Sequence, residues 1–402
     1  MPIAPHRAQS SNRARLRMPQ NARHRDVVYS ARVISFALSD SQKVARDTVR
    51  EFARRELRDR ARPCDEESRC PDELLEKSWA LGLAAACIPE AYGGGGVEGG
   101  HTTSAIVLEE LGYGCASLGA AVAAPMLFVR PLVDFGTEEQ KRDYLPLFTG
   151  DRYHAATLAL HEPRFTFDPC ALETTAERRG ANRVLRGEKR LVPMGARASH
   201  FLVLARGERG PGLANLEAFI LPRDAPGLRV HDEGDTTIGF QAMSWGRLTL
   251  DGVEAPPAWK LGGDSGIDGR RLIASLRVGG AALAVGLSRA VLDACVPYAK
   301  ERVAFGQAIA KKQAIAFMIA DMRIEVDAMR WLVWKAASEL EERGDATRAA
   351  AIAQDYVGRK AMKIADDGIQ VFGGHGFIRD FPLELWFRNA RLLTVHEGPA
   401  AV

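Results

Sequence analysis

Apolar residues recur every three or four positions through most of the first 150 residues, and this spacing predicts helices. The first predicted helix begins at Ser39 or Asp40, either of which can cap it, and its apolar face continues to Leu57. A later helix opens at Thr137, which forms a capping box with Gln140. The other helices predicted here cover residues 72–82, 104–111 and 118–135.

The pattern changes after Gly150, where short apolar runs alternate with turn residues. This alternation is typical of a compact antiparallel β domain, and Pro256-Pro257 and Gly262-Gly263 mark its end. The predicted strands cover residues 154–160, 185–192, 201–205, 216–221 and 247–250.

Long helical patterns return after Gly269, and short connections join them, which favours an antiparallel helical bundle. They cover residues 272–301, 314–343 and 347–372. The order of helices, strands and helices predicts a multidomain α+β chain. We expect a basic unstructured leader at 1–36, an N-terminal helical domain at 37–152, a middle β domain at 153–263 and a C-terminal helical bundle at 264–402.

The net charge of +3 is unevenly distributed along the chain. Met1–Arg32 holds seven arginines, no lysine and one acid, Asp26, whereas the remaining 47 basic and 50 acidic residues give a balance of −3. A slightly acidic body argues against a nucleic-acid-binding protein. The leader has the composition of an organellar transit peptide, but it also fits a disordered basic arm or upstream sequence read from a misplaced start. It shows no sustained amphipathic period, which favours an unstructured or artefactual segment.

Several functional classes find no support in the sequence. The six cysteines are scattered and form no C-x-x-C pair, so we expect reduced thiols in a cytosolic protein and no metal site. A transit peptide would instead indicate the mitochondrial matrix. The longest apolar run, Val278–Leu287, is far shorter than the roughly 18 residues of a membrane span. Gly94–Gly99 matches G-x-G-x-x-G formally, but a helix precedes it where a dinucleotide-binding turn needs a strand.

Three segments carry candidate chemistry, each with an ordinary structural alternative. The basic segment 300–313 is either a solvated loop or an anion-binding one built around Arg302. Gly373, Gly374 and Gly376 end a long helix, yet three glycines exceed what one cap requires and also allow a ligand to approach the backbone. Glu397, beside Gly398, is by spacing alone a surface residue.

Taken together and in order, these pieces resemble the acyl-CoA dehydrogenase family from about Leu38 to Gly398. No single piece is decisive, but seven in the right order are highly specific. The segments that carry the resemblance are 89–94, 136–141, Glu162-Pro163, 282–292, Glu301–Gln313, 370–374 and Glu397-Gly398.

The resemblance implies an N-terminal helical domain, a middle β-barrel-like domain and a C-terminal four-helix bundle that bind FAD between the last two. It also implies a homodimer or homotetramer and an electron-transfer flavoprotein as electron acceptor. The positions that match FAD-binding residues fall into two groups. Arg302, Phe305 and Gln313 match residues that reach FAD across a subunit interface, and Gln370, Gly373 and Gly374 match the backbone stretch beside its diphosphate and adenosine.

Glu397 matches the catalytic base of the family. Some members place the base on the first bundle helix, but the position here is about Leu276, which cannot accept a proton. A carboxylate in an apolar pocket suits removal of an α-proton from an acyl thioester, because desolvation raises its pKa. In the family, the backbone N–H of this Glu and a ribityl hydroxyl stabilise the enolate-like oxygen, and the β-hydrogen leaves as hydride to flavin N5. The product is a 2,3-enoyl thioester of CoA or of an acyl-carrier protein.

The chain departs from the family pattern at the positions that contact flavin. Thr166-Phe167-Asp168 stands where Gly-Ser-Asp is usual, Leu191-Val192-Pro193 replaces Trp-x-Thr, and Pro399 replaces a threonine. Pro193 offers no N–H to a flavin carbonyl, which predicts a rebuilt or weakened flavin environment. Two hypotheses follow: an active FAD-dependent acyl-thioester dehydrogenase, or a non-catalytic or half-site subunit that assembles with a paralogue. Flavin oxidases and monooxygenases on the same fold are a smaller third class.

Overall fold

The computed structural model describes residues 37–96, 100–164, 166–208, 210–234 and 237–402. The chain divides into two units, Met1–Leu38 and Ser39–Val402, and all the elements below belong to the second. The predictions for the leader fall on residues outside the described part.

The N-terminal part is helical as predicted: Ser39 caps the first helix, and the predicted capping box at Thr137 is confirmed. The Ser39 hydroxyl accepts the Gln42 N–H, and the Thr137 hydroxyl accepts the Gln140 N–H. The helix from Asp40 continues as one π-helical turn, and the predicted helix 118–135 is broken at Pro125. The helices are α1 Asp40–Phe52, η1 Ala53–Leu57, α2 Ala61–Glu66, α3 Asp72–Trp79, α4 Leu83–Ala86, η2 Glu90–Tyr92, α5 Gly100–Gly114, α6 Ala116–Ala123, α7 Met126–Phe135, α8 Glu138–Tyr144 and η3 Leu145–Phe148.

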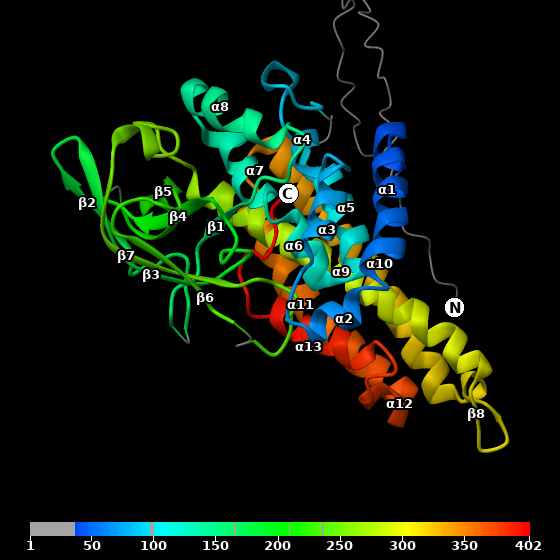
Figure 1. The fold of residues 1–402 in the computed structure, drawn as a ribbon. Coiled ribbons are helices and arrows are strands. Elements are labelled where there is room, and N and C mark those ends of the chain that lie inside the picture. Colours follow the sequence, from blue (N-terminus) through cyan, green and yellow to red (C-terminus); the bar gives the residue numbers. More distant parts are fainter. Residues whose placement is uncertain (1–36, 97–99, 165, 209, 235–236) are drawn as a thin grey trace, which may run out of the picture. The chain divides into compact units, whose positions relative to one another are not determined.

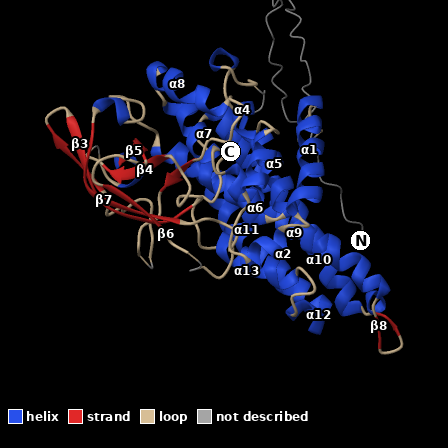
Figure 2. Cartoon of the chain, viewed as in Figure 1, coloured by secondary structure: helices blue, strands red, loops and turns tan. Residues whose placement is uncertain are grey.

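The middle part is a seven-stranded sheet, drawn in red in Figure 2, with the order β1-β4-β2-β3-β7-β6 and β5 paired to β4. Two pairs depart from the expected antiparallel pattern, because β2 meets β4 in parallel at Thr175 and Arg206, and β1 runs parallel to β4 along its length. The β2–β3 hairpin lies between them in sequence and acts as the crossover that a parallel pair requires. The strands are β1 Ala156–Ala159, β2 Thr175–Arg179, β3 Asn182–Val192, β4 His200–Arg206, β5 Leu216–Pro222, β6 Leu228–Asp232 and β7 Gly246–Ala255; short 3-10 helices are η4 Gly212–Asn215 and η5 Pro257–Trp259.

The C-terminal part confirms the predicted helical domain, and α11 has the predicted bounds. Val303–Ala304 and Gln307–Ala308 form a hairpin, β8–β9, at the end of α9, which lies with α12 at one end of the bundle (Figure 1). The elements are α9 Gly269–Glu301, β8 Val303–Ala304, β9 Gln307–Ala308, η6 Ile309–Lys311, α10 Gln313–Arg343, α11 Thr347–Phe372, α12 Gly374–Phe377 and α13 Leu383–Leu393.

Helix α9 packs closely on α5 and thereby joins the two helical parts. A Cβ atom added at Gly112 would lie 2.2 Å from the Leu283 carbonyl oxygen, and one at Gly286 would lie 2.0 Å from that of Glu109. Only glycine permits so close a crossing. Buried Glu109 and Glu110 on α5 also pair with Arg289 on α9, at 2.7 Å and 2.5 Å. These contacts fix the helix that carries one side of the candidate site.

Within the described residues, α9 is the one helix that is long and apolar enough by itself to span a membrane. Of its most apolar 18-residue window, 78% is buried inside the fold, as in the core helix of many proteins.

Candidate functional site

Glu397 follows α13, and its carboxylate faces α9. The Arg277 Nε atom lies 2.5 Å from Glu397 Oε1, and the two side chains are 22% and 15% exposed. The sequence predicted an apolar environment for this carboxylate. The structure places a charged guanidinium in contact with it. Charge-assisted hydrogen bonds of this kind are stronger than neutral ones and fix the orientation of the carboxylate.

The backbone of Glu397 is held from the β domain by His161, which lies just beyond the end of strand β1. The Glu397 N–H donates to His161 Nε2 at 2.7 Å. The His161 ring stacks on His396, with ring centroids 4.1 Å apart, and His396 Nε2 lies 3.0 Å from the Leu191 carbonyl oxygen. Two imidazoles therefore connect Glu397 to the β3 strand.

Burial keeps both imidazoles neutral near pH 7. It lowers the pKa of His396 to about 4, although the hydrogen bond to the Leu191 carbonyl opposes this. Burial, assisted by the neighbouring His396, also lowers the pKa of His161 well below its usual value. A neutral imidazole has one bare nitrogen that can accept a hydrogen bond.

A buried ion pair fixes the segment on either side of His161. Lys189 Nζ lies 2.8 Å from Glu162 Oε1 and donates to the Leu160 carbonyl at 3.1 Å. Glu162 also accepts the backbone N–H groups of Glu173 and Thr174. Burial lowers the pKa of Lys189 to about 8 against the opposing effect of Glu162. Lys189, which belongs to β3, therefore anchors the Glu162-Pro163 motif to that strand.

Two of the positions that depart from the family pattern contact the same two histidines. Phe167 packs against His161, with ring centroids 4.3 Å apart. Leu191, whose carbonyl binds His396, has a left-handed backbone with φ +47°. Strand β3 ends at Val192, directly before Pro193, which has no N–H for a ladder hydrogen bond. Phe167 and Leu191 therefore meet at the stacked pair of histidines.

Leu276, the position of the alternative base, also borders this site. A Cβ atom added at Gly398 would lie 3.2 Å from the Leu276 side chain. Residues 398–402 are buried beyond it, where Ser275 Oγ donates to the Val402 carbonyl at 2.8 Å and a Cβ at Gly280 would meet Pro399 at 3.1 Å. An acidic side chain at position 276 would therefore reach the neighbourhood of Glu397, whereas leucine supplies only apolar surface.

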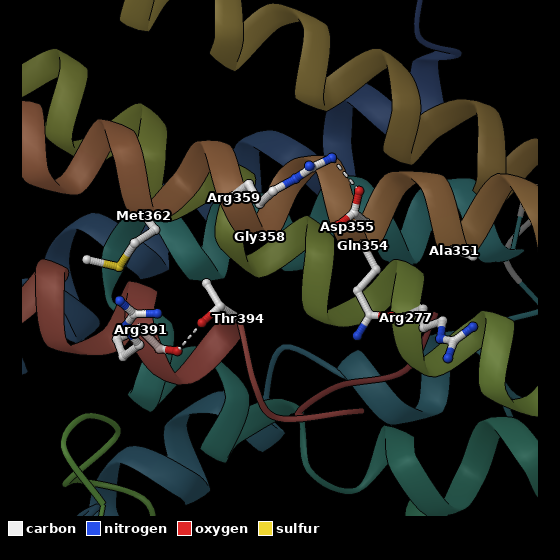
Figure 3. A pocket seen from close by; sticks show the side chains of 9 residues that line it. All are labelled: Arg277, Ala351, Gln354, Asp355, Gly358, Arg359, Met362, Arg391 and Thr394. Atoms are coloured by element: carbon white, nitrogen blue, oxygen red, sulfur yellow. Dashed lines mark hydrogen bonds and ion pairs between the residues drawn. The ribbon is translucent and has the colours of Figure 1, made fainter. Parts of the chain in front are cut away.

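A cavity of about 480 Å³ adjoins Arg277 on the side facing α11 and α13. Figure 3 shows Arg277 at one end of this cavity and Arg391 toward the other, with Arg359 paired to Asp355 on α11. The lining residues are Arg277, Ala351, Gln354, Asp355, Gly358, Arg359, Met362, Arg391 and Thr394.

The residues predicted to bind FAD form a second group at the other end of the bundle. Arg302 caps α9, 25 residues after Arg277, which places it about 37 Å away along the helix. Gln370, Gly373 and Gly374 end α11, and Tyr298 stacks on Phe372 at 3.8 Å, so the two predicted sets lie together. All six predicted residues are exposed, Phe305 by 94%. Within one chain they do not meet Glu397.

Both groups have features that fit a bound dinucleotide. A Cβ atom added at Gly373 or Gly374 would meet nothing within 4 Å, so this backbone is open to a phosphate. Next to Glu397, the buried His396 Nδ1 and Trp245 Nε1 atoms have no hydrogen-bond partner within the described part of the chain, and their rings lie 5.2 Å apart. Buried polar atoms are usually hydrogen-bonded, so these two are available to a polar group of a bound cofactor.

Sequence reasoning missed the residues that hold Glu397 in place. His161, Lys189 and Arg277 were not predicted to belong to the site. The available signals were positional, because His161 directly precedes Glu162-Pro163 and Arg277 directly follows Leu276. Neither position identifies a contact with Glu397, which lies more than 100 residues away in the sequence.

Comparison with known proteins covers nearly all of the second unit. Family models for the N-terminal, middle and C-terminal domains of acyl-CoA dehydrogenases match residues 39–151, 157–253 and 270–402. The probable acyl-CoA dehydrogenase YngJ of Bacillus subtilis (strain 168) is 35% identical over 376 residues, which cover 92% of this chain and 97% of that protein.

Two solved structures show the same arrangement. Butyryl-CoA dehydrogenase from Megasphaera elsdenii has a TM-score of 0.82 and 29% identity, with 91% of this chain and 96% of that chain covered. The prolyl acyl carrier protein oxidase AnaB has a TM-score of 0.81 and 29% identity, with 90% and 96% covered.

Proposed function

The chain belongs to the acyl-CoA dehydrogenase family of flavin-dependent oxidoreductases, and we propose that it oxidises the Cα–Cβ bond of an acyl thioester. The observation that carries this proposal is the placement of Glu397, a largely buried carboxylate oriented by Arg277 beside apolar Leu276. The products are the 2,3-enoyl thioester and the reduced cofactor.

In the proposed reaction Glu397 is the base. Its carboxylate takes the α-proton, and the electron pair of that C–H bond forms the new double bond as the β-hydrogen departs with its own pair. Arg277 holds Oε1 in place, so the carboxylate presents one orientation to the substrate. FAD, when bound, supplies the acceptor for the β-hydride.

The FAD site is proposed to combine two copies of the chain. The exposed end of the bundle carries Arg302, Phe305 and Gln313 together with Gln370, Gly373 and Gly374. Arg302 lies about 37 Å along α9 from Arg277. These residues are therefore suited to a cofactor whose reactive ring lies in a neighbouring copy. The exposed residues Phe317 and Ile324 on α10 supply apolar surface for such a homo-oligomer, which we propose is a dimer or a tetramer.

The acyl carrier is proposed to be CoA or an acyl-carrier protein, since similar structures include enzymes named for each. Electrons are proposed to leave through an electron-transfer flavoprotein. We propose a cytoplasmic location, or the mitochondrial matrix if the leader is a transit peptide.

Anaerobic reduction of the flavin tests the proposal. The FAD-loaded protein is expected to lose its absorbance near 450 nm when a saturated acyl thioester is added, and Glu397→Gln is expected to abolish this bleaching while FAD stays bound. Glu397→Asp is a matched control that keeps the carboxylate but moves it, and it should bleach slowly. Bleaching by Glu397→Gln at the wild-type rate would overturn the assignment of the base.

One observation favours the second candidate, a non-catalytic or half-site subunit that pairs with a paralogue. Both the carboxylate and the backbone N–H of Glu397 already have partners, Arg277 and His161, within the described chain. A protein that binds no FAD on reconstitution, yet restores activity when mixed with a paralogous subunit, would establish this alternative.

A further inference from the structure

The backbone N–H of Glu397 is a donor that the proposed reaction needs. As the α-proton leaves, negative charge develops on the thioester carbonyl oxygen, and a preorganised N–H beside the base can stabilise it. In this structure that N–H points at His161 Nε2, at a distance of 2.7 Å. This N–H is therefore already engaged in a hydrogen bond with His161.

His161 Nε2 lies close to two atoms of Glu397, and only one contact can be a hydrogen bond. The nitrogen is 2.7 Å from the amide nitrogen and 3.0 Å from the carbonyl oxygen. A proton on Nε2 would serve the carbonyl but would face the amide hydrogen at the shorter distance. A bare Nε2 on a neutral ring accepts the N–H without this conflict, so His161 acts as an acceptor with its proton on Nδ1.

The imidazole is held firmly in this position. It is 7% exposed and lies against His396 on one side and Phe167 on another, at 4.1 Å and 4.3 Å between ring centroids. The His161 carbonyl accepts the Arg190 N–H, and the adjacent Glu162 is tied to Lys189. Because the backbone is fixed, the ring can release the N–H mainly by rotation of its own side chain.

We propose that His161 gates the oxyanion-stabilising N–H of Glu397, so that a thioester carbonyl must displace its imidazole to bind productively. This inference rests on the proposed function. His161 is a positioning residue in this account, because it acts through the Glu397 backbone. The gate also contributes to specificity, since a thioester that cannot displace the ring gains no contact with that N–H.

The gate has a measurable effect on affinity. When only a fraction of the protein has a free N–H, the apparent affinity falls by that fraction. One hydrogen bond to a neutral acceptor typically changes such an equilibrium by about three- to tenfold. Removing the acceptor should therefore tighten thioester binding by about that factor, and should lower KM more than it raises kcat.

Two substitutions of the same residue isolate the acceptor. His161→Leu keeps a similar volume but accepts no hydrogen bond, whereas His161→Gln retains an acceptor oxygen. Calorimetric titration of the FAD-loaded proteins with acetoacetyl-CoA, a thioester with no oxidisable Cα–Cβ bond, gives affinities without turnover. We expect His161→Leu to bind about three- to tenfold more tightly than the wild type, and His161→Gln to bind like the wild type.

The possible outcomes separate the gate from the proposed function. Equal or weaker binding by His161→Leu, or the same change in both variants, would overturn the gate. If saturated thioesters still bleach the flavin in that case, the dehydrogenase function stands without it. If no form of the FAD-loaded protein binds acetoacetyl-CoA, the gate fails as proposed for CoA thioesters, and bleaching of the flavin by a saturated thioester of an acyl-carrier protein decides whether the dehydrogenase function stands.

A measurement on the wild-type protein does not depend on how well the variants fold. In protein labelled with ¹⁵N-histidine, the Nε2 resonance of His161, assigned by its absence in His161→Gln, reports whether this nitrogen accepts a hydrogen bond. Saturation with acetoacetyl-CoA is expected to shift it as the N–H is released. An unchanged resonance at saturation would show that the ring stays in place, and would overturn the gate.

Discussion

Arg277 and Glu397 are joined by a 2.5 Å contact between the guanidinium Nε and carboxylate Oε1 atoms. The two residues are 120 positions apart, one on α9 and the other in the segment after α13. Their pairing sets the position of the proposed base relative to the longest helix of the fold. A guanidinium offers directed N–H donors, so it fixes both the position and the rotation of the carboxylate.

Replacing Arg277 by lysine should therefore slow the reaction without unfolding the protein. Lysine keeps the positive charge but cannot reproduce the directed Nε donor, so we expect the rate constant of anaerobic flavin reduction to fall about tenfold. Arg391→Lys, on α13 in the same cavity, is the matched control and should change this rate less than twofold, about the scatter expected of an uninvolved surface substitution. An equal loss in both variants would assign the effect to the cavity and not to the Glu397 contact.

The fold could be predicted largely from local signals. The capping boxes at Ser39 and Thr137, and the limits of α11, depend on residues close together in the sequence. Strands β2 and β6 were not predicted, because β2 is mostly charged and both lie largely exposed. Their pairing with β3 and β7 defines them, and such pairing is a long-range property that periodicity does not encode.

The candidate site was predicted only in part, for the same physical reason. The resemblance to the acyl-CoA dehydrogenase family predicted Glu397 and the exposed residues near Arg302 and Gly373, because they lie in motifs that match the family. The contacts that hold Glu397 cross from His161, after β1, and from α9 to the last segment of the chain, and no spacing rule connects those positions. The flavin-contact departures were visible in the sequence, but the contacts of Phe167 with His161 and of Leu191 with His396 were not.

The buried pair of Lys189 and Glu162 should dominate the stability of the β domain near the site. Lys189→Met leaves the Glu162 carboxylate without its buried partner, which typically costs about 3–5 kcal/mol of unfolding free energy. Urea unfolding at pH 7 measures this loss. Arg179→Ala removes an exposed ion pair with Glu254 on the same sheet and should cost less than about 1 kcal/mol. Similar losses in both variants would contradict the role assigned to the buried pair.

Adding Glu162→Gln to Lys189→Met should restore part of the lost stability. Glutamine removes the uncompensated charge but keeps an oxygen that can accept the N–H of Thr174 or Glu173. No recovery in the double variant would show that the lysine stabilises the fold by packing alone.

Stability should fall as the pH is lowered from 6.5 towards 4, because buried neutral histidines must take up protons on unfolding. Burial lowers the pKa of both His396 and His154 to about 4, against an unfolded value near 6.5. The unfolded chain therefore binds more protons in this range, and stability present above pH 6.5 is lost progressively as the pH falls towards 4. For fully buried His396 the loss is about 3 kcal/mol across that range.

The unfolding free energy measured in urea at pH 7.5 and pH 5 tests this dependence. His396→Gln should reduce the difference between the two pH values, since glutamine does not titrate. His231→Gln, at an exposed position on β6, is the control and should leave the difference unchanged. A pH dependence that His396→Gln does not reduce would indicate that other groups cause it.

A charge on the exposed face of α10 should separate the proposed oligomer and release FAD. Phe317 and Ile324 are 60% and 66% exposed, and with Trp331 they recur every seven residues, which places them on one side of the helix. Burial of this stripe against a second copy would be opposed by a carboxylate, because a buried charge without a partner is costly.

We therefore expect Phe317→Glu to be monomeric in sedimentation experiments and to retain far less FAD than the wild type, because Arg302, Phe305 and Gln313 would no longer reach the cofactor of another copy. Val44→Glu, at a 67% exposed position on α1, is the matched control and should keep both the oligomer and the flavin. Full FAD occupancy in monomeric Phe317→Glu would show that one chain suffices to bind the cofactor, and would overturn the proposed shared site.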